Sequence, residues 1–246
     1  MTKSIVWISG ATQGMGAVLA DLAAESGARV INLDRVPSDR HETIAFDLTD
    51  PESWGAVAAG FGEVFAKGDV DRATLLVVGH ANIGQGILSR VDLDSYRTSF
   101  VANGVGPIML GSLFLRNLPA DVRGGLMLMS SGSAGRPVIG QSSYSACKCA
   151  IEGWVRVVKE EIIRESRDAW LVAVRPGFVD TPSTRELANA DLSLYPRAQK
   201  MGASIEKYAV TAAIGARRIW DALPPPDEAR IISFDGKPED GPQIIA

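Results

Sequence analysis

The feature that most constrains the fold is a glycine-rich turn between two apolar runs near the N-terminus. The first run is residues 5–8, and the turn, residues 9–16, contains Gly10, Gly14 and Gly16. An alanine-rich helical pattern follows, and a second apolar run ends at Asp34. Glycines let the backbone approach a ligand closely and turn sharply into a helix whose N-terminus favours anions. The order strand, glycine turn, helix, strand, acid therefore predicts dinucleotide binding.

The acid at the end of the second run indicates which dinucleotide binds. Asp34 lies 24 residues after Gly10, where a carboxylate accepts hydrogen bonds from the adenosine ribose hydroxyls. The same carboxylate would repel a 2′-phosphate, which favours NAD. Arg35 supports the alternative, NADP, because an arginine at this point can pair with that phosphate. It can equally lie in solvent or over the adenine. We expect NAD, with NADP as the alternative.

Apolar runs and helical patterns alternate along the rest of the chain. Further strands are predicted at 43–46, 73–78, 125–129, 169–174 and 229–234, and further helices at 51–67, from 92 past Pro107, at 144–162 and at 204–223. This alternation predicts an α/β fold, a Rossmann-type doubly wound parallel sheet of about seven strands with helices on both faces. Residues 1–246 are interpreted as a single NAD(P)-binding domain. Residues 183–203 lack clear periodicity and are predicted to form a substrate lid.

A tyrosine four residues before a lysine is the second feature with chemical content. Tyr144 and Lys148 begin a stripe that continues at positions 151, 155, 158 and 162, so both side chains project from one helix face. The ammonium is expected to lower the pKa of the phenol and let it exchange a proton near neutral pH. Ser131, just after an apolar run, could hydrogen-bond the same reacting oxygen. The alternative is a packed tyrosine ring beside a solvated lysine.

Composition excludes several classes of protein. The chain has 246 residues, 46% of them hydrophobic, which suffices for one large core. The net charge of −4 gives no electrostatic case for nucleic-acid binding. We see no apolar run near the roughly 18 residues of a membrane span. The N-terminus leads directly into the first strand and leaves no room for a signal peptide, so a cytoplasmic protein without a membrane anchor is expected.

Cysteine and histidine are scarce. Cys147 and Cys149 are the only cysteines, and they point in different directions from one predicted helix, so they cannot form an ordinary disulfide with each other. Lys148 could activate Cys147 as a thiolate, whereas the alternative is that both cysteines pack as small side chains. His41 and His80 are the only histidines, and no metal site is predicted.

Taken together, the ordered motifs resemble the short-chain dehydrogenase/reductase superfamily, in its compact single-domain branch. The resemblance runs from the turn at Gly10 to Thr181 and beyond. It implies an oxidoreductase that transfers a hydride between a nicotinamide cofactor and a secondary alcohol or ketone by a Ser-Tyr-Lys mechanism. It also implies a homodimer or homotetramer. A helix face near Phe114 or Trp154 could form the interface, whereas the alternative is that such an apolar face builds the core of a monomer.

The resemblance carries over to individual residues. The family's catalytic residues match Asn103, Ser131, Tyr144 and Lys148. Its cofactor contacts match Gly10, Thr12, Gln13, Gly14, Met15, Gly16, Asp34, Arg35, Asp47, Leu48, Gly79, His80, Ala81, Tyr144, Lys148, Pro176, Gly177, Val179 and Thr181. By position, the substrate is expected to meet Ser133, Gln141 and Phe178.

The chain departs from the family pattern at Gly79-His80-Ala81, where many relatives have Asn-Ala-Gly. Losing the asparagine is expected to remove a hydrogen bond between neighbouring strands. Ala81 tolerates a positive φ less well than glycine. His80 either touches the cofactor ribose or fills space.

Two alternative functions remain at this point. The turn 130–133 and the run 176–182 resemble the benzil- and sepiapterin-reductase-like relatives, which are NADP-dependent carbonyl reductases. A non-catalytic dinucleotide-binding sensor of the same fold is the other alternative. Such a sensor could dispense with Ser131, Tyr144 and Lys148, so the presence of all three favours the enzyme.

Overall fold

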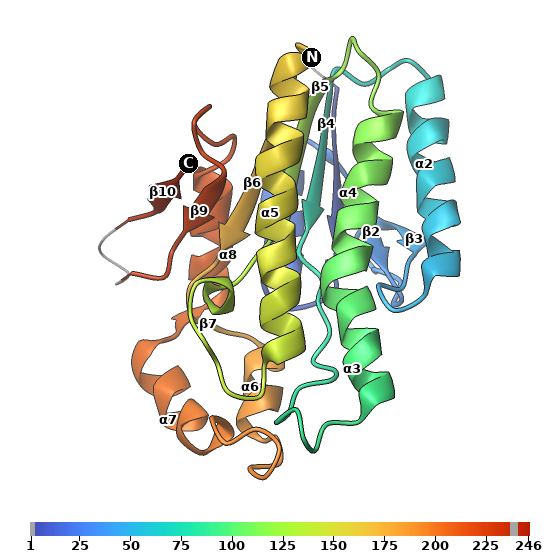
Figure 1. Cartoon of the computed structure of the whole chain (residues 1–246). Helices are drawn as coiled ribbons and strands as arrows, with labels where there is room; N and C mark the ends of the chain where they lie inside the picture. The colour runs from blue at the N-terminus through green and yellow to red at the C-terminus, as the bar shows by residue number, and fades with distance from the viewer. Residues whose placement is uncertain (1–2, 237–240) are drawn as a thin grey trace.

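A mostly parallel sheet forms the centre of the computed structural model, which describes residues 3–236 and 241–246. The strands of this sheet are β1 (Ser4–Ser9), β2 (Arg29–Asp34), β3 (Glu42–Ala45), β4 (Arg72–Val77), β5 (Arg123–Met129), β6 (Ala169–Arg175), β9 (Ile231–Ser233) and β10 (Gln243–Ile245). Their order is β10-β9-β6-β5-β4-β1-β2-β3 (Figure 1). A separate parallel pair joins β7 (Val179–Asp180) to β8 (Val210–Thr211).

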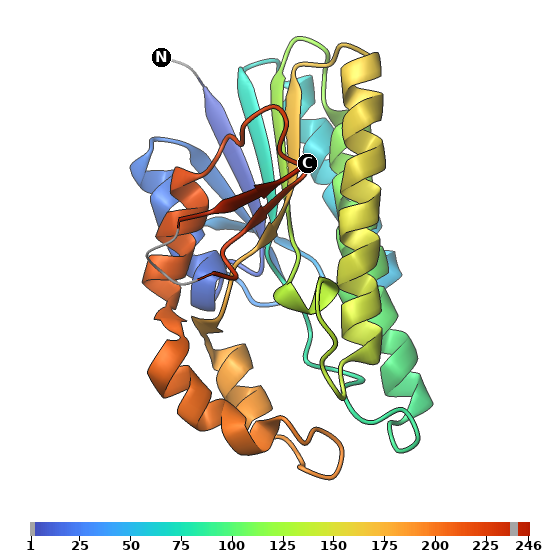
Figure 2. The same cartoon turned by 60° about the vertical axis from the view of Figure 1, so that its left-hand side comes forward.

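Helices cover both faces of the sheet. They are α1 (Gly14–Glu25), α2 (Trp54–Ala66), α3 (Leu93–Phe100), α4 (Gly106–Asn117), α5 (Ser142–Arg164), α6 (Pro182–Ala188), α7 (Ala198–Tyr208) and α8 (Ala212–Asp221), with short turns η1 (Pro51–Ser53), η2 (Val101–Val105) and η3 (Gly132–Ala134). Helices α2, α4 and α5 lie on one face, and α1 and α8 lie on the other (Figure 2). Helices α6 and α7 extend below the sheet as a small lobe (Figure 2).

The first strand shows why both faces are covered. Successive side chains of a strand point to opposite faces, and every residue from Ile5 to Ser9 is buried. Trp7 packs with α2 and α4, its ring centroid 5.1 Å from that of Phe61 and 6.0 Å from that of Phe114. Ile8 belongs to the opposite core with Leu19 of α1. A strand that is apolar on both sides needs helices on both sides.

The predicted doubly wound sheet is confirmed, and it has eight strands where about seven were expected. Strand β10 pairs antiparallel with β9, with Ile244 opposite Ile232. It spans three residues after Gly241-Pro242, which is too short for an alternating pattern to stand out.

The single helix predicted at 204–223 is wrong, and the segment 183–203, which lacks clear periodicity, contains helices. Helix α7 ends at Tyr208 and α8 begins at Ala212. The chain is extended between them because the Thr211 hydroxyl accepts a hydrogen bond from the Ile214 N–H and caps α8. Residues 183–203 hold most of α6 and the start of α7. Short helices separated by turns produce little periodicity over the whole segment.

The helix predicted from residue 92 past Pro107 is interrupted before the proline by a widened turn and not by a break. The Gly106 N–H donates to the Val101 carbonyl across a π turn.

The continuous stretch Leu93–Asn117 is long and apolar enough to span a membrane by length and composition, which the sequence analysis did not anticipate. Within its most apolar window, 56% is buried inside the fold, as expected of a core helix.

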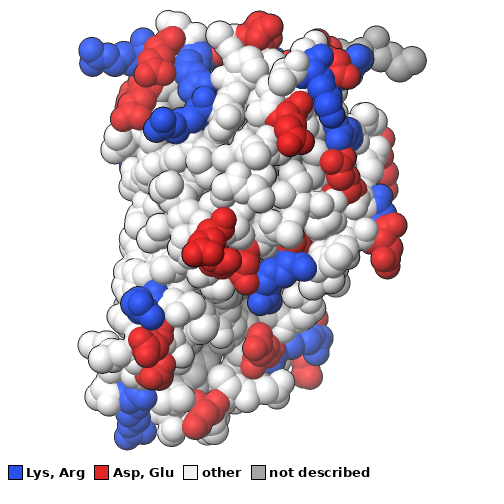
Figure 3. All heavy atoms as spheres, turned by 90° about the vertical axis from the view of Figure 1, so that its right-hand side faces the viewer, with Lys and Arg blue, Asp and Glu red and all other residues white. Residues whose placement is uncertain are grey.

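The interface on a helix face near Phe114 or Trp154 stays a prediction. Phe114 itself is 0% exposed and belongs to the core, and Trp154 is partly buried against the same core. The exposed apolar side chains nearby are Val105 and Met109. Figure 3 shows the side of the molecule where α2 and α4 lie. Few charged side chains appear on it between the charged upper rim and the centre.

A methyl group added at each of two glycines should change the free energy of unfolding in opposite directions. A Cβ on Gly16 would lie 1.9 Å from the Gly10 carbonyl oxygen, whereas a Cβ on Gly153 in α5 meets nothing within 4 Å. We expect Gly16→Ala to lower the free energy of unfolding by roughly 1–3 kcal/mol. Gly153→Ala should raise it by roughly 0.5–1 kcal/mol, since alanine is the better helix former. Urea unfolding of both variants tests this, and an unchanged midpoint for Gly16→Ala would contradict it.

Candidate active site

A cavity of about 860 Å³ opens at the carboxyl ends of the parallel strands, where α/β folds bind ligands. Every residue that the sequence matched to the cofactor or substrate lines this cavity, and so does Ser131. Asn103 is the exception among the predicted site residues, because it is 0% exposed beneath the cavity wall.

The glycine turn has the geometry that a pyrophosphate requires. Gly10 and Gly14 have φ values of +73° and +58°, which favour glycine. A Cβ on Gly10 would lie 2.9 Å from the Gly79 Cα. Gln13, the first residue before α1, makes no side-chain cap, and the first turn of α1 holds no acid. The amide groups at this helix start are therefore open to an anion, which fits a dinucleotide.

Asp34 and Arg35 face different partners. The Asp34 carboxylate accepts a hydrogen bond from the Thr12 hydroxyl at 2.8 Å and from the Val36 N–H at 3.2 Å. The Arg35 Nη1 lies 3.7 Å from the Asp47 Oδ2, with the arginine side chain 71% exposed. Arg35 thus leans toward the acid at the end of the third strand.

Tyr144 and Lys148 lie on one face of α5, as predicted. The Lys148 Nζ is 5.2 Å from the centroid of the Tyr144 ring. It donates a hydrogen bond to the Met129 carbonyl at 2.8 Å. Lys148 is 1% exposed, and burial lowers the pKa of its ammonium to about 8. The lysine is therefore a buried group of the site and not a solvated one.

The predicted lowering of the phenol pKa is wrong for the protein alone. Burial raises the pKa of Tyr144 to about 12, and a hydrogen bond with the Ser131 side chain only partly opposes this effect. Desolvation penalises the phenolate more than its neighbours stabilise it. The phenol therefore holds its proton at neutral pH.

Ser131 is oriented by its own turn. It caps η3, with its hydroxyl oxygen accepting from the Ser133 N–H at 3.2 Å and from the Ser133 hydroxyl at 3.1 Å. Because Ser133 supplies both donors, the Ser131 proton remains for Tyr144 or for a substrate oxygen. This arrangement gives the predicted second hydrogen bond at the reacting centre a structural basis.

Asn103 and Ser9 hold the segment that departs from the family pattern, residues 79–81. The Asn103 side chain accepts from the Ala81 N–H at 2.9 Å and donates to the Ala81 carbonyl at 3.0 Å. The Ser9 hydroxyl accepts from the N–H groups of Val78 and Gly79, both at 3.1 Å. These bonds attach the end of β4 to β1 and to η2. Ala81 does not have a positive φ, so the concern about its backbone does not arise.

His80 takes a role that neither sequence interpretation anticipated. Its Nε2 is 2.7 Å from the Ser183 hydroxyl, so it connects the end of β4 to the start of α6. Asn82 adds bonds to the Ser183 carbonyl at 2.9 Å and to Glu186 at 2.8 Å. The cleft surroundings and the charge of Lys148 lower the pKa of His80. His80 thus helps to hold α6 over the cavity through Ser183.

Cys147 packs as a small side chain. It is 2% exposed, and a Cβ on Gly104 would lie 3.0 Å from its Sγ. Burial raises the pKa of the Cys147 thiol to about 11, which opposes the reactive-thiolate alternative. Cys149 is exposed, and neither cysteine forms a disulfide within the described residues.

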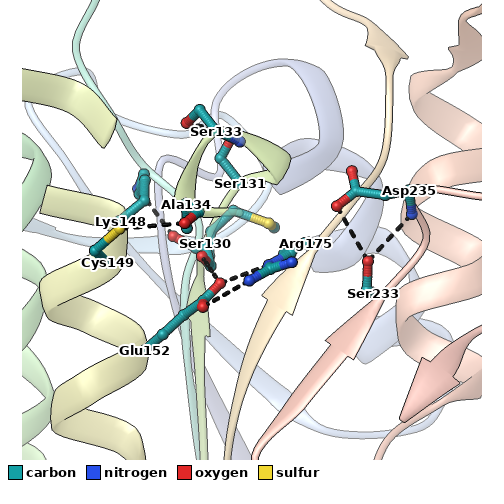
Figure 4. Close-up of polar contacts among 11 residues, drawn as sticks. Ser130, Ser131, Ser133, Ala134, Lys148, Cys149, Glu152, Arg175, Ser233 and Asp235 are labelled. Atoms are coloured by element: carbon teal, nitrogen blue, oxygen red, sulfur yellow. Dashed lines mark hydrogen bonds and ion pairs between the residues drawn. The ribbon is translucent and has the colours of Figure 1, made fainter. Parts of the chain in front are cut away.

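A buried ion pair beside the site was missed from the sequence. Glu152, one helical turn after Lys148, accepts from the Arg175 side chain at 2.6 and 2.8 Å and from the Ser130 hydroxyl at 2.7 Å. The Glu152 and Arg175 side chains are 5% and 15% exposed. Figure 4 shows Glu152 reaching from α5 to both strand ends. The pair links α5 to the residues just before Ser131 and Pro176. The one sequence signal for this ion pair is the position of Glu152, at helical spacing after Lys148.

The substrate end of the cavity holds both expected and unexpected residues. Gln141 and Phe178 line it as predicted, and the Gln141 side-chain amide donates to Gln85 at 3.1 Å. Arg136 and Arg197 also line it. The sequence analysis missed both arginines because neither belongs to a motif or to a periodic face.

The chain is similar in sequence to known proteins. Residues 4–192 match the family model described as short chain dehydrogenase. The chain is 25% identical to a 3-oxoacyl-(acyl-carrier-protein) reductase of Vibrio cholerae, covering 96% of this chain and 90% of the relative. It is also 25% identical to the 2,3-dihydro-2,3-dihydroxybenzoate dehydrogenase of Escherichia coli, covering 76% of this chain and 73% of that protein.

Solved structures share the fold. A short chain dehydrogenase/reductase from Saccharomyces cerevisiae superposes with a TM-score of 0.80 at 15% identity, covering 98% of this chain and 100% of that one. A short chain dehydrogenase from Burkholderia cenocepacia in complex with NADP gives a TM-score of 0.72 at 21% identity, covering 96% and 98%.

Removing the charge of Glu152 should be costly. Glu152→Gln leaves the buried Arg175 guanidinium without its counter-charge, so we expect the free energy of unfolding to fall by roughly 3 kcal/mol. Glu42→Gln is the matched control, because Glu42 pairs with Arg29 on the surface, and it should cost less than about 1 kcal/mol. Chemical denaturation measures both values. Equal losses in the two variants would refute the structural role of the buried pair.

Proposed function

The chain belongs to the short chain dehydrogenase family, and from that membership we propose that it transfers a hydride between NAD and a secondary alcohol or ketone. The observation that carries the proposal is the convergence of Ser131, Tyr144 and Lys148 in the same cavity as the glycine turn. The family makes the chain an oxidoreductase, and these side chains supply the acid, its neighbour and the orienting hydroxyl that such a reaction needs.

The cavity is divided between cofactor and substrate. The glycine turn would hold the pyrophosphate, Asp34 the adenosine ribose, and Asp47 with Leu48 the adenine. Lys148 would bind the nicotinamide ribose, and Pro176, Gly177, Val179 and Thr181 would border the nicotinamide ring. When bound, the nicotinamide supplies or accepts the hydride.

Tyr144 would move the proton. Because burial raises the pKa of Tyr144 to about 12, the phenol is protonated at neutral pH and ready to donate to the oxygen of a carbonyl being reduced. In the reverse direction the phenolate would accept the proton of the alcohol. Ser131 would hydrogen-bond the same oxygen and fix its position.

Asn103 would contribute through its backbone. Its side chain is occupied by Ala81, so a water held by this residue would contact its backbone carbonyl oxygen. The residue four positions later is Pro107, which has no N–H to donate to that carbonyl. The Asn103 carbonyl could therefore accept from a water that connects Lys148 with solvent.

The contacts of Arg35 favour NAD over NADP. Arg35 leans toward Asp47, while Asp34 presents a carboxylate where a 2′-phosphate would lie. An NADP-dependent carbonyl reductase remains the second candidate, since one relative in fold binds NADP. We also propose that the enzyme acts in the cytoplasm on a small molecule, as a homodimer or homotetramer.

Loss of the phenol hydroxyl should stop proton transfer without harming cofactor binding. We expect Tyr144→Phe to lower kcat/KM by a factor of roughly 10²–10⁴ while the Kd for NADH changes little. The control is Tyr208→Phe, because Tyr208 is 62% exposed on α7, and its activity should be normal. Turnover of a ketone panel and fluorescence titration with NADH provide the readouts. Near-normal turnover by Tyr144→Phe would refute the proposed role. Tight NADH binding by the wild type without turnover would favour the sensor.

The cofactor preference should depend on Asp34. Asp34→Ser removes the charge that repels a 2′-phosphate, so the ratio of kcat/KM for NADPH to that for NADH should rise by at least about tenfold, equivalent to 1.4 kcal/mol. Arg35→Gln in the same background should reverse part of the gain, because it removes the guanidinium that can pair with the phosphate. A wild-type enzyme that already prefers NADPH would contradict the assignment of NAD.

A further inference from the structure

A second tyrosine at the substrate end of the cavity has an unused hydroxyl. Tyr195 is 2% exposed and lines the cavity. Within the described part of the chain its hydroxyl makes no hydrogen bond, yet it is not among the polar atoms sealed from solvent. The hydroxyl is therefore reached from the cavity. Since buried tyrosine hydroxyls usually find a partner, this one points to a ligand atom.

The position of Tyr195 is fixed by its neighbours. A Cβ on Gly140 would lie 2.8 Å from the Tyr195 Cδ2, so the ring packs where only glycine leaves room. The Gly86 N–H donates to the Gly140 carbonyl at 2.8 Å, and the Ile87 N–H donates to the Leu194 carbonyl at 2.9 Å. These bonds join three segments around the ring. The hydroxyl is thus held in place before a ligand arrives, which reduces the cost of binding.

Two arginines give this end of the cavity a positive charge. Arg197 follows Tyr195 by two residues, and its charge opposes the effect of burial on the pKa of the Tyr195 phenol. Arg136 lies in the loop after η3. Both residues line the cavity and are exposed, and neither has an ion pair or hydrogen bond with any residue that the structure describes. Unpaired arginines facing a cavity suit a carboxylate or a phosphate.

None of the acids that line the cavity forms an ion pair with Arg136 or Arg197 within the described residues. Asp34 and Asp47 are at the adenosine end, as described above. Asp235 accepts from the Ser233 hydroxyl at 3.1 Å, and its charge acts on Arg175; Figure 4 shows it beside that group. The positive charge near Tyr195 therefore has no acid assigned to it among the lining residues.

We propose that the substrate carries an acid group, a carboxylate or a phosphate, in addition to its reacting alcohol or carbonyl. Arg197 and Arg136 bind the acid group, and the Tyr195 hydroxyl donates a hydrogen bond to one of its oxygens. The apolar lining of Phe178, Leu187 and Met201 accommodates the carbon chain of such a molecule. This inference rests on the proposed function and names its substrate class.

Matched pairs of substrates test the proposal with the NADH-loaded enzyme. The carboxylate arm compares 5-oxohexanoate with its methyl ester, and the phosphate arm compares dihydroxyacetone phosphate with dihydroxyacetone. We expect kcat/KM to favour the acid over its neutral partner at least tenfold in one arm, and that arm identifies the acid group. Arg197→Gln, Arg136→Gln and Tyr195→Phe should each reduce this ratio several-fold, mainly through KM. Arg164→Gln, at the far end of α5, should leave the ratio unchanged.

The outcomes separate the inference from the proposed function. Equal turnover of acid and neutral partners, or a ratio unaffected by the variants, overturns the acid-group site while the dehydrogenase remains. If no compound is turned over, thermal shift with hexanoate against hexanamide in the presence of NADH still decides. Stabilisation of the wild type by hexanoate alone, reduced in Arg197→Gln, supports the site. The same response in both proteins overturns it.

Discussion

The burial of one ammonium group governs the chemistry of this fold. Lys148 is almost completely enclosed, with the Met129 carbonyl as its hydrogen-bond acceptor. An unfolded lysine titrates near 10.4, and burial lowers the pKa to about 8. The native state therefore binds fewer protons than the unfolded state between these pH values, so the burial costs stability at neutral pH and the cost fades as pH rises toward 10.4. Packing of Ile151 and Val155 of α5 against the sheet offsets it and fixes Lys148 below Tyr144.

Helix α5 is joined to the ends of strands β5 and β6. Glu152 binds the strand ends through Ser130 and Arg175, and the next residues along those strands are Ser131 and Pro176. The orienting hydroxyl and the segment assigned to the nicotinamide are therefore positioned by the same carboxylate. On the other side, His80 holds α6 over the cavity through Ser183. Local backbone geometry alone would not bring these groups to one place.

Sequence reasoning succeeded where the signal is local. The turn at Gly10 and the spacing of Tyr144 and Lys148 depend on neighbouring residues, and the structure places all of them in one cavity. It failed where the outcome depends on distant groups. The contact of Glu152 with Arg175 joins residues 23 apart on different elements. The direction of the Tyr144 pKa shift depends on desolvation by the surrounding fold, which residue spacing does not report.

The most direct measurement of the central claim is the ultraviolet titration of Tyr144, taken as the difference between the wild type and a protein lacking that phenol. The account predicts a pKa near 12 for the protein alone. It also predicts a clear decrease when saturating NAD adds its positive ring beside the phenol. A phenol that titrates near 10, or one that does not respond to NAD, would contradict the view that Tyr144 is a desolvated acid at the cofactor site.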